Sequence, residues 1–263
     1  MVWYRLMFSP FKALLKRLIR PEIRIAMRYR VMQLRYAFDF GDAAECPICG
    51  RCCTRFATFN GRANAMCPRC FSLERHRLIF LYLRARTRVF EEDMAVLHFA
   101  PEKCLAAKLR QRQGARYVTA DNMTQHIALI EVKPDRTMSL TKIEDPDDTY
   151  DLVICSHVLE HVMEDCQAMI EMCRVLKPGG MALIMVPINP GASVSLEDYS
   201  LDENQRREQY GSPHHVRYYA EADLVRRLAE CGFAVTADDF VRSQNAARFV
   251  LNPTDMIYRC EKR

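Results

Sequence analysis

Four cysteines in two pairs are the residues whose type and spacing point most directly to chemistry. Each pair has the pattern Cys-Pro-x-Cys, and 17 residues separate the first pair from the second. This spacing is typical of zinc ribbons, in which two pairs of thiolates enclose a tetrahedral structural ion and leave no position open for catalysis. We therefore predict one structural zinc, held by Cys46, Cys49, Cys67 and Cys70.

The other cysteines are predicted to have no part in metal binding. A redox function is the competing interpretation of a Cys-x-x-Cys pair, but one pair would suffice for it, and it would precede a helix in a thioredoxin-like unit. Cys52 and Cys53 are adjacent, and adjacent side chains rarely aim at one ion, so both are taken as bystanders. The remaining cysteines are scattered among apolar residues, which favours small core residues in a reducing cytoplasm.

Short apolar runs downstream predict the elements that must position this chemistry, a parallel sheet with helices. Residues 152–155 and 181–186 are expected to be buried strands, and apolar residues from Val158 to Leu176 recur at helical spacing until Pro178-Gly179-Gly180 ends the helix. Residues 94–100 and 117–121 predict two earlier strands. A helix over 72–83, capped by Ser72, and a later helix over 221–231, followed by strands over 234–240 and 256–260, complete the expected order.

Asp121 ends the second of these strands, 23 residues after His98. This is close to the offset of roughly 20 residues at which an acid binds ribose hydroxyls in nucleotide-binding βαβ units. In such sheets ligands bind at the carboxyl ends of the strands. We therefore expect a ligand site beside Asp121.

Several segments together resemble one family. They are the two cysteine pairs with the Ser-Leu-Glu-Arg-His-Arg run at 72–77, Val-Leu-His-Phe-Ala-Pro-Glu at 96–102, Ser-His-Val-Leu-Glu-His-Val at 156–162, Val-Leu-Lys-Pro-Gly-Gly at 175–180 and His-Val-Arg-Tyr-Tyr at 215–219. Over residues 44–235 the chain is similar to class I S-adenosylmethionine (SAM)-dependent methyltransferases, in a type 11-like branch with an N-terminal zinc ribbon. The resemblance implies an α/β fold, with a Rossmann-like class I methyltransferase sheet beside a small zinc ribbon.

The resemblance also implies a set of SAM contacts, with two departures from the family pattern. First, residues 98–103 replace the usual acidic residue and Gly-x-Gly turn, so Glu102 is expected to bind the amino group of SAM. Second, Ser139 stands where many relatives have an aspartate. Arg75, His76 or Arg77 is expected to reach the carboxylate of SAM, unless this face of the helix packs on the ribbon. The implied cofactor contacts are Ala100, Pro101, Glu102, Asp121, Asn122, Ser139, Leu140, Cys155, Ser156 and Arg75.

The resemblance places the acceptor at the end of the strand over 152–155 and under the segment that follows the strand over 181–186. His215 and His157 are the candidate catalytic bases, because a histidine near its ordinary pKa can take a proton at neutral pH. Arg217 and Tyr218, in the His-Val-Arg-Tyr-Tyr segment, are the candidate acceptor contacts. The expected acceptor is a small molecule, a glycan or a membrane-associated intermediate with a hydroxyl or amine.

Charge divides the chain unevenly and suggests an anionic partner for its N-terminal part. Residues 1–88 have a net charge of +13 and the remaining residues −8. Residues 9–20 predict a helix with apolar and basic sides, as on an anionic membrane surface, and a second helix follows through Ile23, Met27, Val31 and Leu34. These helices could instead pack on the protein's own core. We expect a basic extension over 1–43, a ribbon over 44–71 and a methyltransferase domain over 72–263. The protein is expected to be cytoplasmic, with peripheral attachment to the inner membrane face as the alternative.

Three functions from different classes remain open. The first is SAM-dependent methyl transfer to a polar metabolite, glycan or membrane-associated acceptor. The second is methylation of ribosomal or transfer RNA, with the ribbon and the basic N-terminal part holding the RNA, although the sequence lacks the Asn-Pro-Pro-aromatic motif of exocyclic-amine methylation. The third is a non-catalytic binding module that has kept the fold.

Overall fold

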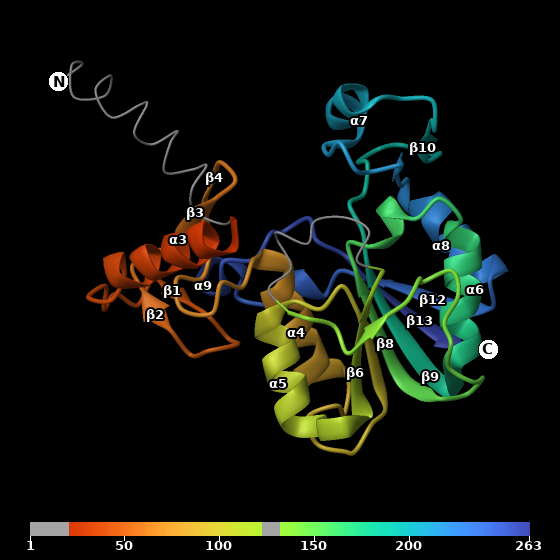
Figure 1. Ribbon diagram of the computed structural model, residues 1–263, viewed down its shortest axis with the longest axis horizontal. Helices are drawn as coiled ribbons and strands as arrows, with labels where there is room; N and C mark the ends of the chain where they lie inside the picture. The colour runs from red at the N-terminus through yellow and green to blue at the C-terminus, as the bar shows by residue number, and fades with distance from the viewer. Residues whose placement is uncertain (1–20, 123–131) are drawn as a thin grey trace.

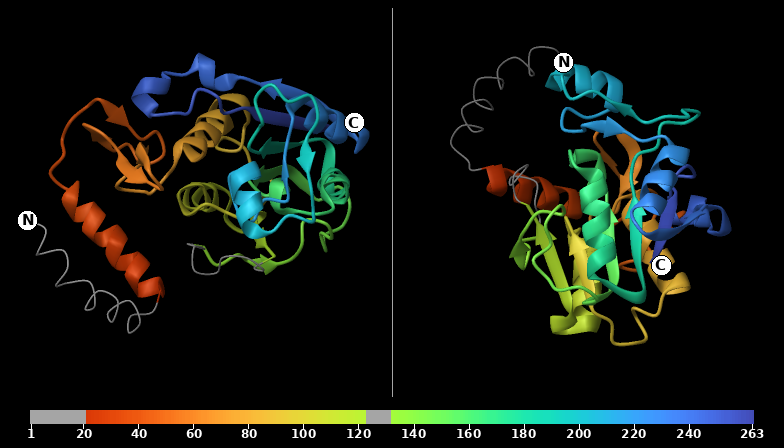
Figure 2. Two further views of the ribbon diagram at one scale, coloured as in Figure 1. Left: turned by 90° about the horizontal axis from the view of Figure 1, so that it is seen from above. Right: turned by 90° about the vertical axis from the view of Figure 1, so that its right-hand side faces the viewer.

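The computed structural model describes residues 21–122 and 132–263. The helix predicted over 9–20 therefore lies outside the described residues. Within them, a sheet domain carries a small N-terminal module at one side, and an insert stands above one end of the strands (Figures 1 and 2).

The central sheet has the strand order β12-β13-β9-β8-β5-β6-β7. Its strands are β5 (Val96–Phe99), β6 (Tyr117–Asp121), β7 (Arg136–Thr137), β8 (Tyr150–Ser156), β9 (Leu176–Met185), β12 (Phe233–Asp238) and β13 (Ile257–Lys262). The ladders joining β7, β6, β5, β8 and β9 are parallel, whereas β13 runs antiparallel to both β9 and β12. The predicted α/β fold with a mostly parallel sheet is confirmed.

Successive side chains along the buried strands point to opposite faces of the sheet, and both faces are covered by helices. On β8, Leu152 and Ile154 belong to an apolar cluster with α4 (Glu74–Arg86) and α5 (Lys103–Gln113). Val153 and Cys155 point the other way, into a cluster with α6 (Asp165–Val175) and α8 (Glu221–Glu230). A strand buried on both faces reads as an unbroken apolar run, as this one does.

The N-terminal module consists of α3 (Pro21–Arg35) and two short hairpins. One pairs β1 (Ala44–Glu45) with β2 (Cys52–Cys53), and the other pairs β3 (Ala57–Phe59) with β4 (Arg62–Met66). Helix α3 packs on the rest of this module through Tyr29, whose ring stacks on Phe71 with centroids 4.4 Å apart. Residues spaced along its other side, Ile23, Met27, Val31 and Leu34, are each at least half exposed.

Arg77 joins the module to the sheet domain. Its guanidinium is fully buried over the Phe56 ring and donates to the carbonyls of Ala65 and Ser72. It also donates to the carbonyls of Phe249, at the end of α9 (Ala246–Phe249), and of Val250. One arginine on α4 thus bonds the ribbon and a segment more than 170 residues later, so it is structural and not available to a ligand.

Three local predictions were wrong. Ser72 does not cap α4, because its hydroxyl lies 3.3 Å from two cysteine sulfurs, while the ring of His76 accepts the backbone N–H of Leu73. The helix expected from Val158 begins only at Asp165, after a single 3₁₀ turn over Leu159–His161. The Pro-Gly-Gly segment does not end the helix, because α6 stops at Val175 and residues 178–180 belong to β9, in a bulge that contains Gly179 with φ of +77°.

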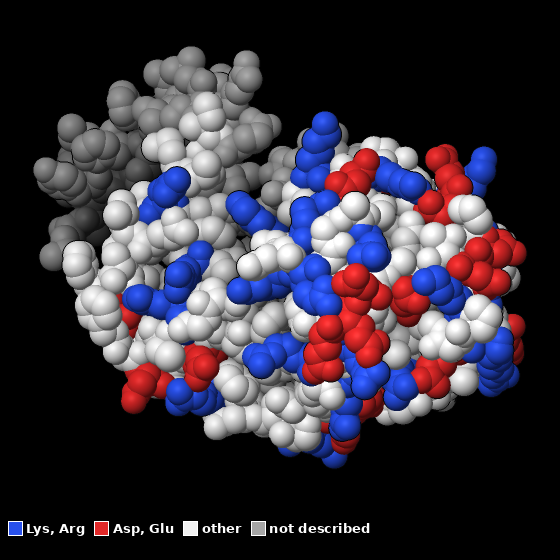
Figure 3. Space-filling view, turned by 90° about the horizontal axis from the view of Figure 1, so that it is seen from below, with Lys and Arg blue, Asp and Glu red and all other residues white. Residues whose placement is uncertain are grey.

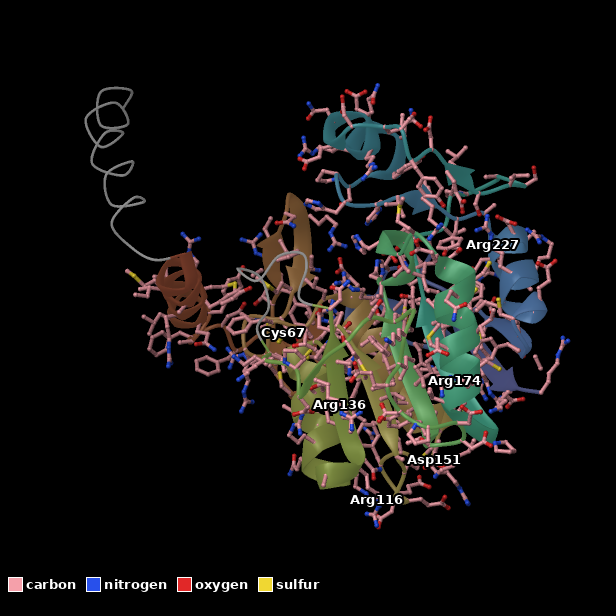
Figure 4. All side chains as sticks on the ribbon, turned by 45° about the vertical axis from the view of Figure 1, so that its right-hand side comes forward. Cys67, Arg116, Arg136, Asp151, Arg174 and Arg227 are labelled. Atoms are coloured by element: carbon pink, nitrogen blue, oxygen red, sulfur yellow. The ribbon has the colours of Figure 1, made fainter. Side chains whose placement is uncertain are left out.

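The insert after β9 carries β10 (Leu196–Glu197), α7 (Glu203–Tyr210) and β11 (Arg217–Tyr218). Asp202 caps α7 by accepting two backbone N–H groups, and Gly211 ends it in a left-handed conformation. The insert stands at the carboxyl ends of the parallel strands, and Asp151 and Arg116 lie at the opposite end of the sheet (Figure 4). The remaining short elements are the 3₁₀ turns η1 (Gly114–Arg116) and η4 (Phe240–Ser243).

Candidate cofactor and acceptor site

Three cavities meet at the carboxyl ends of the parallel strands. The first, of about 320 Å³, is lined by six residues predicted to form the site: Ala100, Asp121, Asn122, Ser139, Leu140 and His157. The second, of about 310 Å³, shares Ala100 and Asp121 with the first and extends over Pro101, Glu102 and Arg75. A ligand that bridges Ala100 and Asp121 could therefore occupy both.

The loops after β5 and β8 turn sharply at the two residues that border these cavities. Ala100 donates its N–H to Ala120, and His157 donates its N–H to Met185, so each extends a strand ladder by one residue. Each then leaves the strand with a positive φ, +48° for Ala100 and +55° for His157. This conformation favours glycine, and for other residues it is costly and concentrated at functional sites. Ala100 thus takes a glycine-type turn without a glycine.

Glu102 is held at the wall of the second cavity by residues below and beside it. Its carboxylate lies 3.0 Å from His98 Nε2 and 3.6 Å from His76 Nε2, and the other ring nitrogen of His98 bonds the Tyr117 hydroxyl. Burial opposes ionisation, but the interactions with His76, His98 and Arg75 lower the pKa of Glu102. Glu102 is therefore a buried anion, suited to a ligand ammonium.

Arg75 lies between the second cavity and a third, of about 470 Å³. Its Nε is buried and has no hydrogen-bond partner among the residues that the structure describes. A guanidinium so placed can bind a carboxylate. Arg75 and Glu102 together offer one cation and one anion at the same cavity, the arrangement that an α-amino acid group requires.

The third cavity adjoins the first at His157, which lines both. Tyr218 from β11 and Asp255 from the loop before β13 also line it. Burial raises the pKa of Asp255, whose carboxylate accepts a hydrogen bond from Asn252. This cavity therefore offers two groups, His157 and Asp255, that could take a proton from a bound molecule.

Glu160 lies behind His157 in a cluster of imidazoles. Its side chain is 1% exposed, with an oxygen 3.1 Å from His157 Nδ1 and 4.0 Å from His215 Nε2. The rings of His161 and His215 meet edge to face, with centroids 4.8 Å apart. Burial alone would raise the pKa of Glu160, but the three histidines lower it, whereas burial lowers the pKa of His215.

Arg217 fixes this cluster from the insert. It is fully buried and donates to the carbonyls of Leu159, Val162 and Met163, and to the carboxylate of Glu197 on β10. All of its nitrogens are used within the protein, so the predicted acceptor contact of Arg217 is replaced by a structural role. It holds the 3₁₀ turn that carries Glu160 and His161 against the insert.

The four predicted zinc ligands meet at one point in the N-terminal module. Cys46 Sγ lies 3.5 Å from Cys70 Sγ, Cys49 Sγ lies 3.7 Å from Cys67 Sγ, and all four sulfurs are within 4.8 Å of one another. Around one zinc with bonds of about 2.3 Å, tetrahedral sulfurs are roughly 3.8 Å apart. Cys67 lies where the ribbon faces the sheet domain (Figure 4). Cys52 and Cys53 are outside this cluster, so the residues present fit one tetrahedral ion.

The remaining predicted residues lie beside the cavities without lining them. Cys155 and Ser156 are buried on β8, and Cys155 packs in the apolar cluster with α6. His215 bonds the carbonyl of Tyr210 through Nδ1 and directs Nε2 toward Glu160. Sequence reasoning missed the roles of His98, Glu160 and Asp255. His98 and Glu160 stand within quoted motifs, but Asp255 had no local signal, because only the long loop before β13 brings it to His157.

Comparison with known proteins assigns the family. A family model described as a methyltransferase domain matches residues 74–238, more than half of the chain. The chain belongs to this family. A protein of Mycolicibacterium smegmatis, described as a probable S-adenosylmethionine-dependent methyltransferase, is 30% identical over 101 residues, which are 37% of this chain and 34% of that protein. The match thus spans about a third of that relative's length.

Solved structures show the same fold at low sequence identity. The cyclase SpnF has a TM-score of 0.52 at 15% identity, with 81% of this chain and 89% of SpnF covered. YcgJ from Bacillus subtilis has a TM-score of 0.50 at 16% identity, with 72% of this chain and 99% of YcgJ covered. These likenesses confirm the methyltransferase-type sheet of this domain, and they leave its reaction to be argued from the site.

Proposed function

We propose that this protein is a SAM-dependent methyltransferase acting on a hydroxyl or amine of a polar metabolite, a glycan or a membrane-associated intermediate. The observation that carries the proposal is the pair of cavities joined at Ala100 and Asp121, with an acid at the ribose position and a buried anion and cation beyond it. These groups match the parts of SAM in order along the strand ends.

Each part of SAM has a matching group in this chain. Asp121 would accept hydrogen bonds from the ribose hydroxyls. Glu102 would bind the ammonium and Arg75 the carboxylate, which would give its buried Nε a partner. Leu140 and Ser139 line the first cavity, where they would contact the adenine. When bound, SAM supplies an electrophilic methyl group on a sulfonium.

The chain's own residues would prepare the acceptor in the third cavity. His157 faces both this cavity and the first, so it is placed to take the proton from an acceptor hydroxyl or amine at Nε2. Its other nitrogen, Nδ1, is 3.1 Å from Glu160, which would stabilise the imidazolium that forms. Tyr218 would contact the acceptor, and His215 would act on His157 through Glu160.

A structural zinc in the four-cysteine cluster is also proposed. The supporting observations are the sulfur separations and the full burial of Cys46 and Cys67. No open position would remain on such an ion, so its contribution is to folding and not to methyl transfer.

The proposed partner of the N-terminal part is an anionic membrane surface. Among the described residues no helix could span a bilayer, but α3 exposes an apolar stripe of Ile23, Met27, Val31 and Leu34, as surface-lying helices do. On the face shown in Figure 3, Lys and Arg side chains predominate near the N-terminal module, whereas basic and acidic side chains are mixed over the rest of that face. RNA is the second candidate, because the +13 charge of residues 1–88 suits a phosphate backbone.

The cofactor assignment is tested by calorimetric titration of SAM into the wild type and Asp121→Ala. We expect an affinity loss of about 1.5–3 kcal/mol, because the variant removes one partner of charge-assisted hydrogen bonds. Asp147→Ala is the matched control, since Asp147 is exposed and pairs with Arg174 away from the cavities. Equal affinity for wild type and Asp121→Ala would place the nucleotide elsewhere.

The reaction is tested with methyl-labelled SAM and fractionated cell extract. Label in small molecules, glycans or lipids supports the leading proposal, whereas label that nuclease releases supports RNA methylation. SAM binding without transfer to any fraction supports a binding module, and the fold of the cyclase SpnF shows that this sheet is not restricted to one reaction.

A further inference from the structure

Glu160 is a buried carboxylate that lacks well-aligned hydrogen-bond donors among the described residues. Its side chain is 1% exposed, and neither oxygen has a well-aligned hydrogen-bond donor among the residues that the structure describes. Burying an ionised carboxylate is costly unless it is paired or bound to a metal. The proposed contact with His157 would engage one oxygen of Glu160 and the proposed SAM contacts neither, so the second oxygen has no partner in the part of the chain that the structure describes.

Two of the imidazoles around Glu160, those of His161 and His215, are oriented by backbone carbonyls. His161 Nδ1 lies 3.0 Å from the carbonyl of His214, and His215 Nδ1 lies 2.9 Å from the carbonyl of Tyr210. A carbonyl only accepts, so Nδ1 must carry the proton in each ring, and in a neutral ring Nε2 keeps its lone pair. Metal-binding histidines are oriented in this way, by donating the other ring N–H to a carbonyl or carboxylate.

We propose that Glu160, His161 and His215 form a second metal site, which takes one divalent transition-metal ion through a carboxylate oxygen and two Nε2 atoms. Suitable atoms of the three side chains lie within 4.8 Å of one another. Two of them, His215 Nε2 and a Glu160 oxygen, are 4.0 Å apart, so bonds of roughly 2.0–2.2 Å to one ion are reached with small side-chain shifts. Two histidines and one carboxylate with further positions open are a set used by divalent iron and related metals.

The site is rigid and accessible. Arg217 bonds the carbonyls of Leu159 and Val162 on either side of Glu160 and His161, so the turn is fixed before an ion arrives. His161 also lines the first cavity, which provides the entry path that a metal site requires. The two sites differ in ligands, because the ribbon offers four thiolates and this site none.

An ion at Glu160 would lie next to His157, at the junction of the first and third cavities. A divalent cation lowers the pKa of an oxygen ligand bound to it, so this position favours a hydroxyl acceptor over an amine. That choice of acceptor rests on the proposed function. The binding experiment below is independent of the proposed function, because it measures metal occupancy and not methyl transfer.

The test is a cobalt(II) titration of the full-chain protein, whose four-cysteine cluster has first been loaded with zinc. Binding is followed by visible absorption and by calorimetry. We expect one equivalent to bind with a spectrum of nitrogen and oxygen ligation, and binding to raise the melting temperature by mass action. Glu160→Gln, His161→Gln and His215→Gln should each weaken binding by at least about 10-fold, since even the partners of metal ligands have effects of that size.

Glu164→Gln is the matched control, because Glu164 lines the first cavity and loses the same charge, yet lies outside the cluster. It should bind cobalt as the wild type does. His161→Gln keeps the test valid if a change at buried Glu160 prevents folding, because His161 is only half buried at the cavity wall. Equal binding by wild type and His161→Gln, or cobalt only in place of the thiolate-bound zinc, would overturn the proposal, even if methyl transfer is found.

Discussion

At the scale of single residues, the site depends on backbone conformations as much as on side chains. Ala100 and His157 each leave a strand with a positive φ, and each borders the point where two cavities meet. A turn of this kind brings the backbone close to a ligand, and it directs the His157 ring toward the third cavity. The residues that follow, Glu102 and Glu160, then bring buried carboxylates to the same edge of the sheet.

His157→Gln is predicted to lower turnover by at least about 30-fold, because general-base assistance typically contributes 10²–10⁴ in rate. SAM affinity of the same variant should change little, which separates a loss of chemistry from a loss of folding. The measurement is kcat and KM with the acceptor, beside a SAM titration.

Asp255→Asn is the informative comparison for His157→Gln. Asp255 lines the same third cavity and its pKa is raised by burial. A larger loss of turnover in Asp255→Asn than in His157→Gln would mean that Asp255 is the general base. Normal turnover in both would leave proximity as the source of catalysis and an amine as the acceptor.

At the scale of elements, α4 links the two parts of the molecule through Arg77. Arg77→Met is predicted to lower the free energy of unfolding by at least about 3 kcal/mol, because four carbonyls, two of them on fully buried residues, would lose the hydrogen bonds of a buried guanidinium. Thermal and denaturant unfolding measure the change. Arg84→Met on the same helix is the control, since Arg84 is exposed and should differ from wild type only slightly.

Helix α3 offers a second prediction at this scale. Replacing Met27, Val31 and Leu34 together by serine should reduce sedimentation with anionic vesicles, because these side chains are exposed on one face of the helix. Val194→Ser with Leu196→Ser is the control, as these exposed apolar residues belong to the insert. Undiminished sedimentation of the triple variant would remove α3 from the proposed membrane contact.

At the scale of the whole molecule, the ribbon and the cofactor site share a wall. Cys70, Phe71 and Leu73 line the second cavity together with Ala100 and Glu102. Removing zinc with a chelator is therefore predicted to weaken SAM binding as well as to lower the melting temperature, because a structural zinc contributes directly to folding. Metal analysis should return one equivalent held by thiolates.

Cys49→Ser should reproduce the effect of the chelator on SAM affinity, whereas Cys52→Ser should not, because Cys52 lies outside the cluster. SAM affinity that is unchanged after loss of the thiolate-bound zinc would mean that α4 and the strand loops hold the cavity without the ribbon.

The sheet was largely predictable because each buried strand appears as a short apolar run, as at 152–155. Strand β7 was not, since its two residues, Arg136 and Thr137, are exposed and carry no apolar signal. The helix predicted from Val158 failed for a related reason. Helical spacing of apolar residues there is real, but the bonds of Arg217 to the carbonyls of Leu159 and Val162 hold the chain in a 3₁₀ turn.

The site was predictable where a motif is contiguous and not where it is assembled by folding. Asp121 and Glu102 lie at the strand ends where they were expected. Arg217 looked like a ligand contact because a lone arginine in a motif has no visible partner in the sequence. Its partners come from the Leu-Glu-His-Val turn and from β10, and only the fold brings these segments together.

The central sheet cannot be completed in the order in which the chain is synthesised. Strand β13 lies between β9 and β12, so the ladder to β9 stays open until residues 257–262 have left the ribosome. Arg77 likewise waits for the carbonyls of Phe249 and Val250. During translation β9 is therefore an exposed apolar edge that could pair with another nascent chain, and this interval is when the protein most needs a chaperone.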